Sequence, residues 1–87
     1  MKKLVTPIVN RNGSSCKGLV TENMDVVRKL LDLKEAINSI MPHGRDYQIE
    51  GLLTEARSAM LERYSAINVM IAEFEAHTIE IFKQEEN

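Results

Sequence analysis

The side chains best suited to chemistry lie together in the stretch Pro42-His43-Gly44-Arg45-Asp46-Tyr47. The guanidinium of Arg45 is a planar fork that fits phosphate or carboxylate. The ring of Tyr47 offers a surface on which a nucleobase can stack. Asp46 can accept hydrogen bonds from a base or a ribose, and His43 can add a donor. The stretch therefore predicts a site for a small anionic ligand of the nucleotide type.

A structural interpretation of the same stretch is also open. Pro42 disfavours helix in the residue before it and has no amide donor, and Gly44 permits a left-handed turn. Asp46 could cap a following helix, Arg45 could pair with a glutamate of a neighbouring subunit, and Tyr47 could cover the end of a bundle. Both interpretations make this stretch a corner between two helices.

The helix predicted before the corner spans residues 15–41. Ser14 or Ser15 can cap its start, although Gly18 weakens the first turns and makes Thr21 an alternative start. Its apolar side chains fall at helical spacing into two seams, which together are wider than one partner helix needs. The first seam is Val20, Met24, Val27 and Leu31; the second is Val26, Leu30, Leu33, Ile37 and Ile40.

The helix predicted after the corner spans residues 49–84. Its apolar stripe persists for about five heptads, which strongly favours a helix. At 1.5 Å per residue it would be about 50 Å long, against at most about 40 Å for the first helix. We therefore expect its C-terminal end to overhang, or the N-terminal arm to pack there. The stripe consists of Ile49, Leu53, Ala56, Met60, Ile67, Met70, Phe74 and Ile81.

These patterns predict one domain over residues 1–87, with an arm and turn at 1–14, helices at 15–41 and 49–84, and a corner at 42–48. The predicted fold class is all-α: an antiparallel two-helix hairpin with an extended N-terminal arm. A chain of 87 residues has a thin margin of stability. Because the second helix covers only one seam of the first, we expect the arm or a second subunit on the other. The predicted assembly is a homo-oligomeric helical bundle.

Composition excludes several classes of function. Eleven basic against thirteen acidic residues give a net charge of −2, which argues against a duplex nucleic-acid partner. No phosphate-binding glycine loop, paired histidine motif or cysteine pair occurs, so we expect no enzyme, metal or cofactor. Cys16 cannot form an internal disulfide, and no apolar run of about 20 residues exists. We expect a cytoplasmic protein with no membrane partner.

The chain resembles a widespread family of small tailed-phage proteins over about residues 7–82. The resemblance is carried by Asn12-Gly13-Ser14-Ser15 and by the Gly-Arg-Asp-Tyr corner, before a helix with Ala56 and Arg63. Gln48 stands where the family has a second tyrosine, and Ser14 where it has threonine. Met60 or Glu62 occupies a position where histidine is common. The hairpin also resembles the hairpin domain of phage anti-CBASS and anti-Thoeris proteins.

Those proteins bind cyclic oligonucleotide or cyclic ADP-ribose signals between subunits of a homo-oligomer and do not cleave them. The resemblance thus implies a phage or prophage anti-defence protein, in an infected or lysogenic bacterial cell, that sequesters a cyclic nucleotide. Asn12 and Ser14 would add polar contacts to the corner, and Arg57 or Arg63 would add charge from a neighbouring second helix. The alternative is a protein–protein interaction module, a phage inhibitor or adaptor of a host protein.

Overall fold

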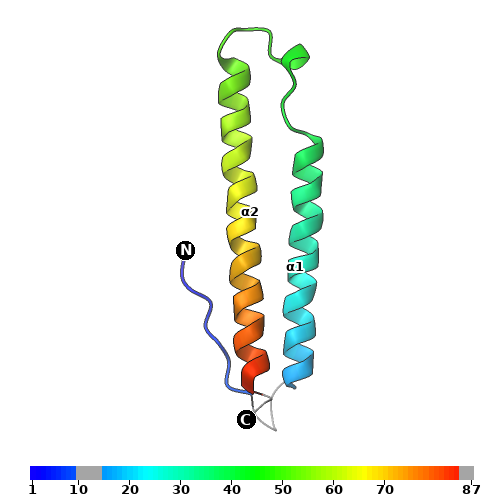
Figure 1. Cartoon of the computed structure of the whole chain (residues 1–87), viewed down its shortest axis with the longest axis vertical. Helices are drawn as coiled ribbons and strands as arrows, with labels where there is room; N and C mark the ends of the chain where they lie inside the picture. The colour runs from blue at the N-terminus through cyan, green and yellow to red at the C-terminus, as the bar shows by residue number, and fades with distance from the viewer. Residues whose placement is uncertain (10–14, 85–87) are drawn as a thin grey trace.

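The computed structural model describes residues 1–9 and 15–84, and every regular element in these ranges is helical. An extended arm over residues 1–9 is followed by α1 (Cys16–Ser39), a short 3₁₀ helix η1 (Gly44–Asp46) and α2 (Leu52–Lys83). α1 and α2 run antiparallel, and the arm lies along the side of α2 away from α1 (Figure 1). The molecule is a rod of 61 × 21 × 18 Å. The predicted all-α hairpin is confirmed.

The ends of α1 follow from its flanking residues. The side chain of Ser15 caps the helix and accepts a hydrogen bond from the Gly18 amide at 3.0 Å, as the sequence predicts. α1 ends at Ser39, two residues earlier than predicted. The Met41 amide still donates to the Asn38 carbonyl at 3.4 Å, so the last turn tightens before Pro42 stops the helix.

The start of α2 differs from the prediction, because the helix begins at Leu52 rather than at Ile49. Gly51 precedes it with a left-handed backbone (φ 89°) and no side-chain cap. The left-handed turn expected at Gly44 is therefore wrong, since Gly44 instead opens η1. Asp46 lies in η1, five residues before Gly51, so it does not cap α2.

Substitution of Gly51 by alanine is expected to lower the free energy of unfolding by about 1 kcal/mol, because a Cβ atom disfavours the left-handed conformation. A Cβ at this position would meet no atom within 4 Å, so backbone strain is the whole cost. Gly44→Ala is the control, since its Cβ would make only ordinary contact with Leu53 at 3.8 Å. Urea unfolding of both variants measures the difference. Equal stabilities would contradict the assigned turn.

The contact between α1 and α2 buries few side chains. Val27 from the first seam of α1 and Ile67 and Ile81 from α2 are buried, and Ile81 alone among the described side chains is fully enclosed. The Cys16 thiol donates to the Ile81 carbonyl at 3.4 Å, which ties the start of α1 to the end of α2. α2 packs against the first seam, whereas the sequence predicted only that it would cover one of the two. With Cys16 counted, only four apolar side chains in the described residues are buried, which is a thin core for this length.

The second seam of α1, here called the α1 seam, comprises Val26, Leu30, Leu33, Ile37 and Ile40. Val26, Leu33 and Ile40 are 36%, 48% and 63% exposed, and the two others are only half-buried. α2 does not cover this seam, because Val26 lies about 100° around the helix from buried Val27.

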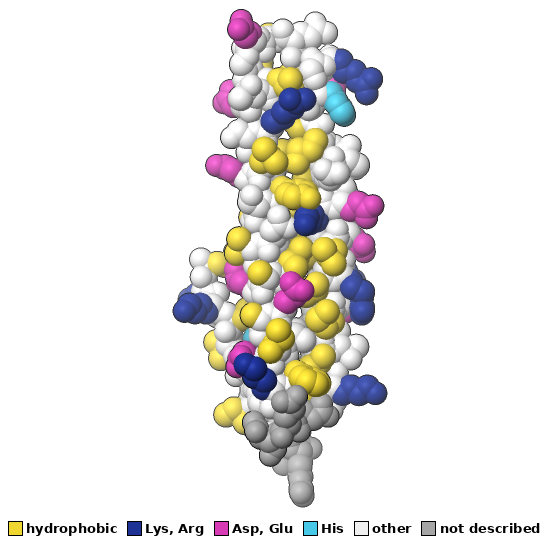
Figure 2. Space-filling model, viewed as in Figure 1, with side chains coloured by type: hydrophobic (Ala, Val, Ile, Leu, Met, Phe, Trp, Pro, Cys, Tyr) yellow, Lys and Arg dark blue, Asp and Glu magenta, His cyan; other side chains and the backbone are white. Residues whose placement is uncertain are grey.

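Hydrophobic side chains also form a band along the line between the two helices on the face shown in Figure 2. In the first seam, Leu31 is 46% exposed and borders a shallow hollow shared with Tyr64. The ammonium group of Lys34 lies 5.2 Å from the centre of the Tyr64 ring, a cation–π distance. Apolar surface therefore remains on α1 beyond the α1 seam.

The arm is fixed to its own chain by Gln84. The Val9 amide donates to Gln84 Oε1 at 2.9 Å, and Gln84 Nε2 donates to the Pro7 carbonyl at 2.8 Å. Further along, the arm borders α2 at Glu73, Ala76, His77 and Glu80. The arm therefore lies on α2, and the α1 seam stays open.

The extra length of α2 lies at the corner rather than at the C-terminal end. The two helices are level where Cys16 and Ile81 meet, whereas α2 extends beyond α1 at the other end (Figure 1). Residues 40–51 run beside the first turns of α2 and span the length by which α2 extends beyond α1. The corner is consequently raised above the end of α1.

Candidate functional site

Backbone hydrogen bonds shape the corner. The Asp46 amide donates to the His43 carbonyl at 3.1 Å, and the Tyr47 amide donates to the Gly44 carbonyl at 3.2 Å. These i to i+3 bonds make the single turn of η1. The Gln48 side chain adds a bond to the Arg45 carbonyl at 3.4 Å. The corner thus has a defined backbone although its side chains are exposed.

Arg57 joins the corner to α2. Its Nε donates to the carbonyl of buried Pro42 at 3.2 Å, in a partly buried position. Because Nε is the group that makes this bond, the two terminal nitrogens of the guanidinium remain for a ligand. Arg57 therefore both holds the corner and brings a second positive charge to it. Arg57 thus reaches the corner of its own chain, whereas the sequence predicted an arginine from a neighbouring second helix.

The corner side chains that were predicted to bind a ligand are exposed to solvent. His43, Arg45, Asp46 and Tyr47 are all exposed, and no hydrogen bond or ion pair within the described residues engages their side chains. An open hollow lies between η1 and the end of α1. It is lined by Ser39, Ile40, Met41, Pro42, His43, Asp46 and Tyr47.

Among the remaining predicted site residues, the structure describes Arg63, which does not join the corner of its own chain. Arg63 lies on α2 six residues beyond Arg57 and donates to the Ala59 carbonyl of its own helix at 3.0 Å. Asn12 and Ser14 fall outside the described residues. Their described neighbours lie at the end of the hairpin opposite the corner, because Val9 bonds to Gln84 after α2 and Ser15 caps the start of α1. A ligand that touched this end and a corner would have to touch two chains.

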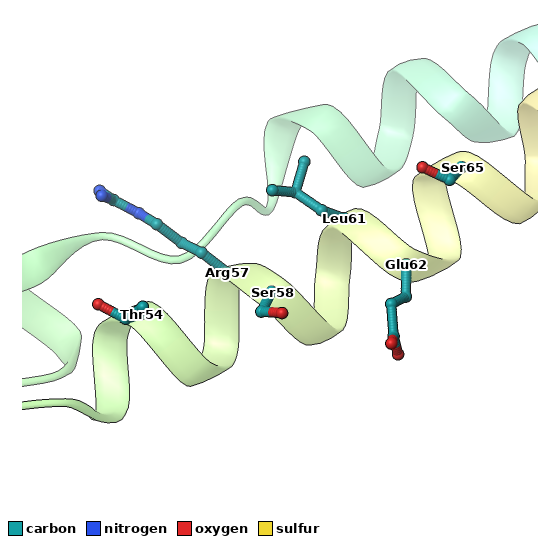
Figure 3. A pocket seen from close by; sticks show the side chains of 6 residues that line it. All are labelled: Thr54, Arg57, Ser58, Leu61, Glu62 and Ser65. Carbon is teal, nitrogen blue, oxygen red and sulfur yellow. The ribbon is translucent and has the colours of Figure 1, made fainter.

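A shallow groove on α2 beside the corner was missed by the sequence reasoning. Three hydroxyl side chains line it together with Arg57, Leu61 and Glu62. Arg57 and Leu61 extend toward the corner segment and α1, whereas Glu62 points away from both (Figure 3). The spacing of the hydroxyl residues at helical intervals was a readable signal, but the apolar stripe drew attention to the opposite side of the helix. The hydroxyl residues are Thr54, Ser58 and Ser65.

Electrostatics distinguish the corner from the rest of the surface. The described ion pairs lie elsewhere: Asp25 pairs with Lys29 and Arg28, and Glu80 pairs with Lys83. Hydrogen bonds from Lys29 and Arg28 lower the pKa of Asp25, which keeps that exposed carboxylate ionised.

The described residues contain no cluster of three metal-ligating side chains. Nor does the described part of the chain hold a helix with the length and apolar character needed to cross a bilayer.

Comparison of the chain with protein-family models, with curated proteins and with solved structures finds no match. The functional argument therefore depends on the geometry and chemistry of the corner.

Proposed function

We propose that this chain assembles with copies of itself and binds a small cyclic nucleotide signal at the corner, holding it without cleaving it. The observation that supports this most is the pair of guanidinium groups at one short segment. Arg57 donates to the Pro42 carbonyl, and Arg45 lies three residues after Pro42. No described carboxylate pairs with either arginine. Unpaired arginines beside an exposed tyrosine suit an anionic ligand with a ring that can stack.

Binding without cleavage is supported by the lack of a cysteine nucleophile at the corner. The single cysteine, Cys16, is buried against Ile81 at the opposite end of the hairpin. The corner contributes histidine, arginine, aspartate and tyrosine, and none of these side chains is oriented by a hydrogen bond to another within the described residues. General acid–base or nucleophilic catalysis needs such oriented pairs.

A second chain would complete the site. The hollow at the corner is open, and two helices alone offer little concavity. A neighbouring subunit would supply the opposite wall, as it does in the phage proteins that the hairpin resembles. Self-assembly also fits the uncovered α1 seam described above.

Calorimetric titration tests the proposal with a panel of cyclic dinucleotides, cyclic trinucleotides and cyclic ADP-ribose isomers. We expect micromolar or tighter binding of at least one ligand. Arg45→Ala should weaken it about 10- to 100-fold, because it removes a charge-assisted hydrogen bond of about 1.5–3 kcal/mol. The matched control is Arg28→Ala, which removes an exposed arginine of α1 that already pairs with Asp25. Absence of heat with every ligand would refute the proposal, as would equal effects of the two variants.

A protein–protein interaction module is the second proposal. It is favoured by large apolar side chains exposed on α2, including Leu61, Val69 and Ile79. Exposed apolar surface of this kind marks contact sites in soluble proteins. In this case a protein partner would bind without nucleotide, and Leu61→Asp would abolish its capture while Arg45→Ala would not.

A further inference from the structure

The α1 seam is only partly covered by the described residues of its own chain, and three of its five side chains are exposed. The arm lies on α2, and the side of α1 that carries Val26, Leu33 and Ile40 is open. A core of four buried apolar side chains among the described residues is small for a stable domain of this length. A second copy is the occupant that this seam fits, because it brings an equally uncovered seam of the same length.

The spacing of the α1 seam is that of a coiled coil. Val26, Leu33 and Ile40 repeat every seven residues, with Leu30 and Ile37 at the intermediate positions. Such seams pair when a helix packs knobs into the holes of its neighbour. Ala59 and Ala66 on α2 are small and exposed at the same sevenfold spacing, which leaves room beside the seam for another helix.

Charges that flank the α1 seam decide the direction of pairing. Glu22 and Lys29 border the seam on its solvent side, where Lys29 also pairs with Asp25 of its own chain. Lys34 borders the seam on the side of α2, with its ammonium group 5.2 Å from the centre of the Tyr64 ring. Parallel pairing would set Lys29 of one copy beside the partner's Lys34, which places like charges together on both sides of the interface. Antiparallel pairing separates these lysines. It also brings Glu22 to the end of the partner's α1.

We propose that two copies pair their α1 seams antiparallel, with Leu30 against the partner's Leu33 and Val26 against the partner's Ile37. This proposal deepens the proposed function and rests on its assumption of self-assembly. In this register the partner's Glu22 lies beside His43 and Arg45. Neither of these two side chains has a partner within the described residues of its own chain.

The partner's Glu22 thereby becomes part of the corner site. Its carboxylate accepts hydrogen bonds from hydroxyl or amino groups, which a ribose or a nucleobase offers. Arg45 and Arg57 carry two positive charges against the single negative charge that the partner's Glu22 adds. Pairing of the two α1 seams would therefore also form the second wall of the corner site.

Distances between spin labels test the arrangement in the protein without nucleotide. Single cysteines replace Asp32 and Lys17 in a Cys16→Ser background, in which the serine hydroxyl can still donate to the Ile81 carbonyl. At about 1.5 Å per residue, antiparallel pairing places the labels at Asp32 within about 20 Å of each other and those at Lys17 about 45 Å apart. Short distances at both positions would show parallel pairing and overturn the proposal, as would the absence of any interchain coupling.

Charge reversal tests the contact between Glu22 and Arg45. Glu22→Arg and Arg45→Glu should each raise the dimer dissociation constant about tenfold, and the double variant should restore it to within about threefold. Additive losses in the double variant would refute the contact. These measurements need no ligand, so their outcome is independent of the titration. Label distances of about 20 and 45 Å together with no nucleotide binding would support the interface and refute only the proposed nucleotide binding.

Discussion

Leu33→Asp is expected to convert the proposed dimer into single chains and to raise the dimer dissociation constant at least about 100-fold. Leu33 lies at the centre of the α1 seam, so a symmetric pair would bury two aspartates in apolar layers. Burying an unpaired polar or charged group costs about 2 kcal/mol or more per site. Sedimentation equilibrium over a concentration series measures the change, and thermal unfolding should show a lower melting temperature at the same protein concentration.

Leu31→Asp provides the control for this experiment. Leu31 belongs to the same helix and is 46% exposed, close to the 48% of Leu33, but it lies in the first seam. Its replacement should leave the dissociation constant within about threefold of the original. If both variants dissociate the assembly equally, the interface is not confined to the α1 seam.

Arg57→Ala is expected to weaken ligand binding about 100-fold and to lower the free energy of unfolding by about 1–2 kcal/mol. The first effect follows from the loss of a guanidinium that would face the proposed ligand, and the second from the partly buried bond to the Pro42 carbonyl. Calorimetric titration and urea unfolding measure the two effects separately. A loss of stability with unchanged affinity would make Arg57 a purely structural residue.

The matched control is Arg63→Ala, on the same helix. Arg63 is exposed and bonds only to the Ala59 carbonyl of its own helix among the described contacts, so neither property should change measurably. A large loss of affinity in this variant would show that a neighbouring subunit brings Arg63 to the ligand. That result would favour an assembly with α2, rather than α1, beside the corner.

Local sequence signals predicted the elements of this fold well. Ser15 caps α1 because its hydroxyl reaches the Gly18 amide, and Pro42 stops the helix within two residues of the expected position. The heptad pattern identified α2, although it did not decide which seam of α1 this helix covers. These features depend on neighbours a few residues apart, which a sequence displays directly.

Features that depend on contacts through space were not predictable in the same way. Gly44 and Gly51 both permit a left-handed turn, and only the path of the chain selects Gly51. The bond from Arg57 to the Pro42 carbonyl joins residues fifteen positions apart and decides which arginine of α2 belongs to the corner. Sequence alone placed Arg57 and Arg63 on an equal footing. The corner itself was predicted, because its residues are contiguous.

The double hydrogen bond of Gln84 has a consequence for how the molecule is made. The Val9 amide donates to a side chain that lies 75 positions further along the chain. During synthesis residues 1–9 therefore emerge long before the side chain that anchors them exists. Docking of the arm is accordingly a late folding step that requires a finished α2, and a ribosome stalled before Gln84 would hold a chain whose leading end is still unattached.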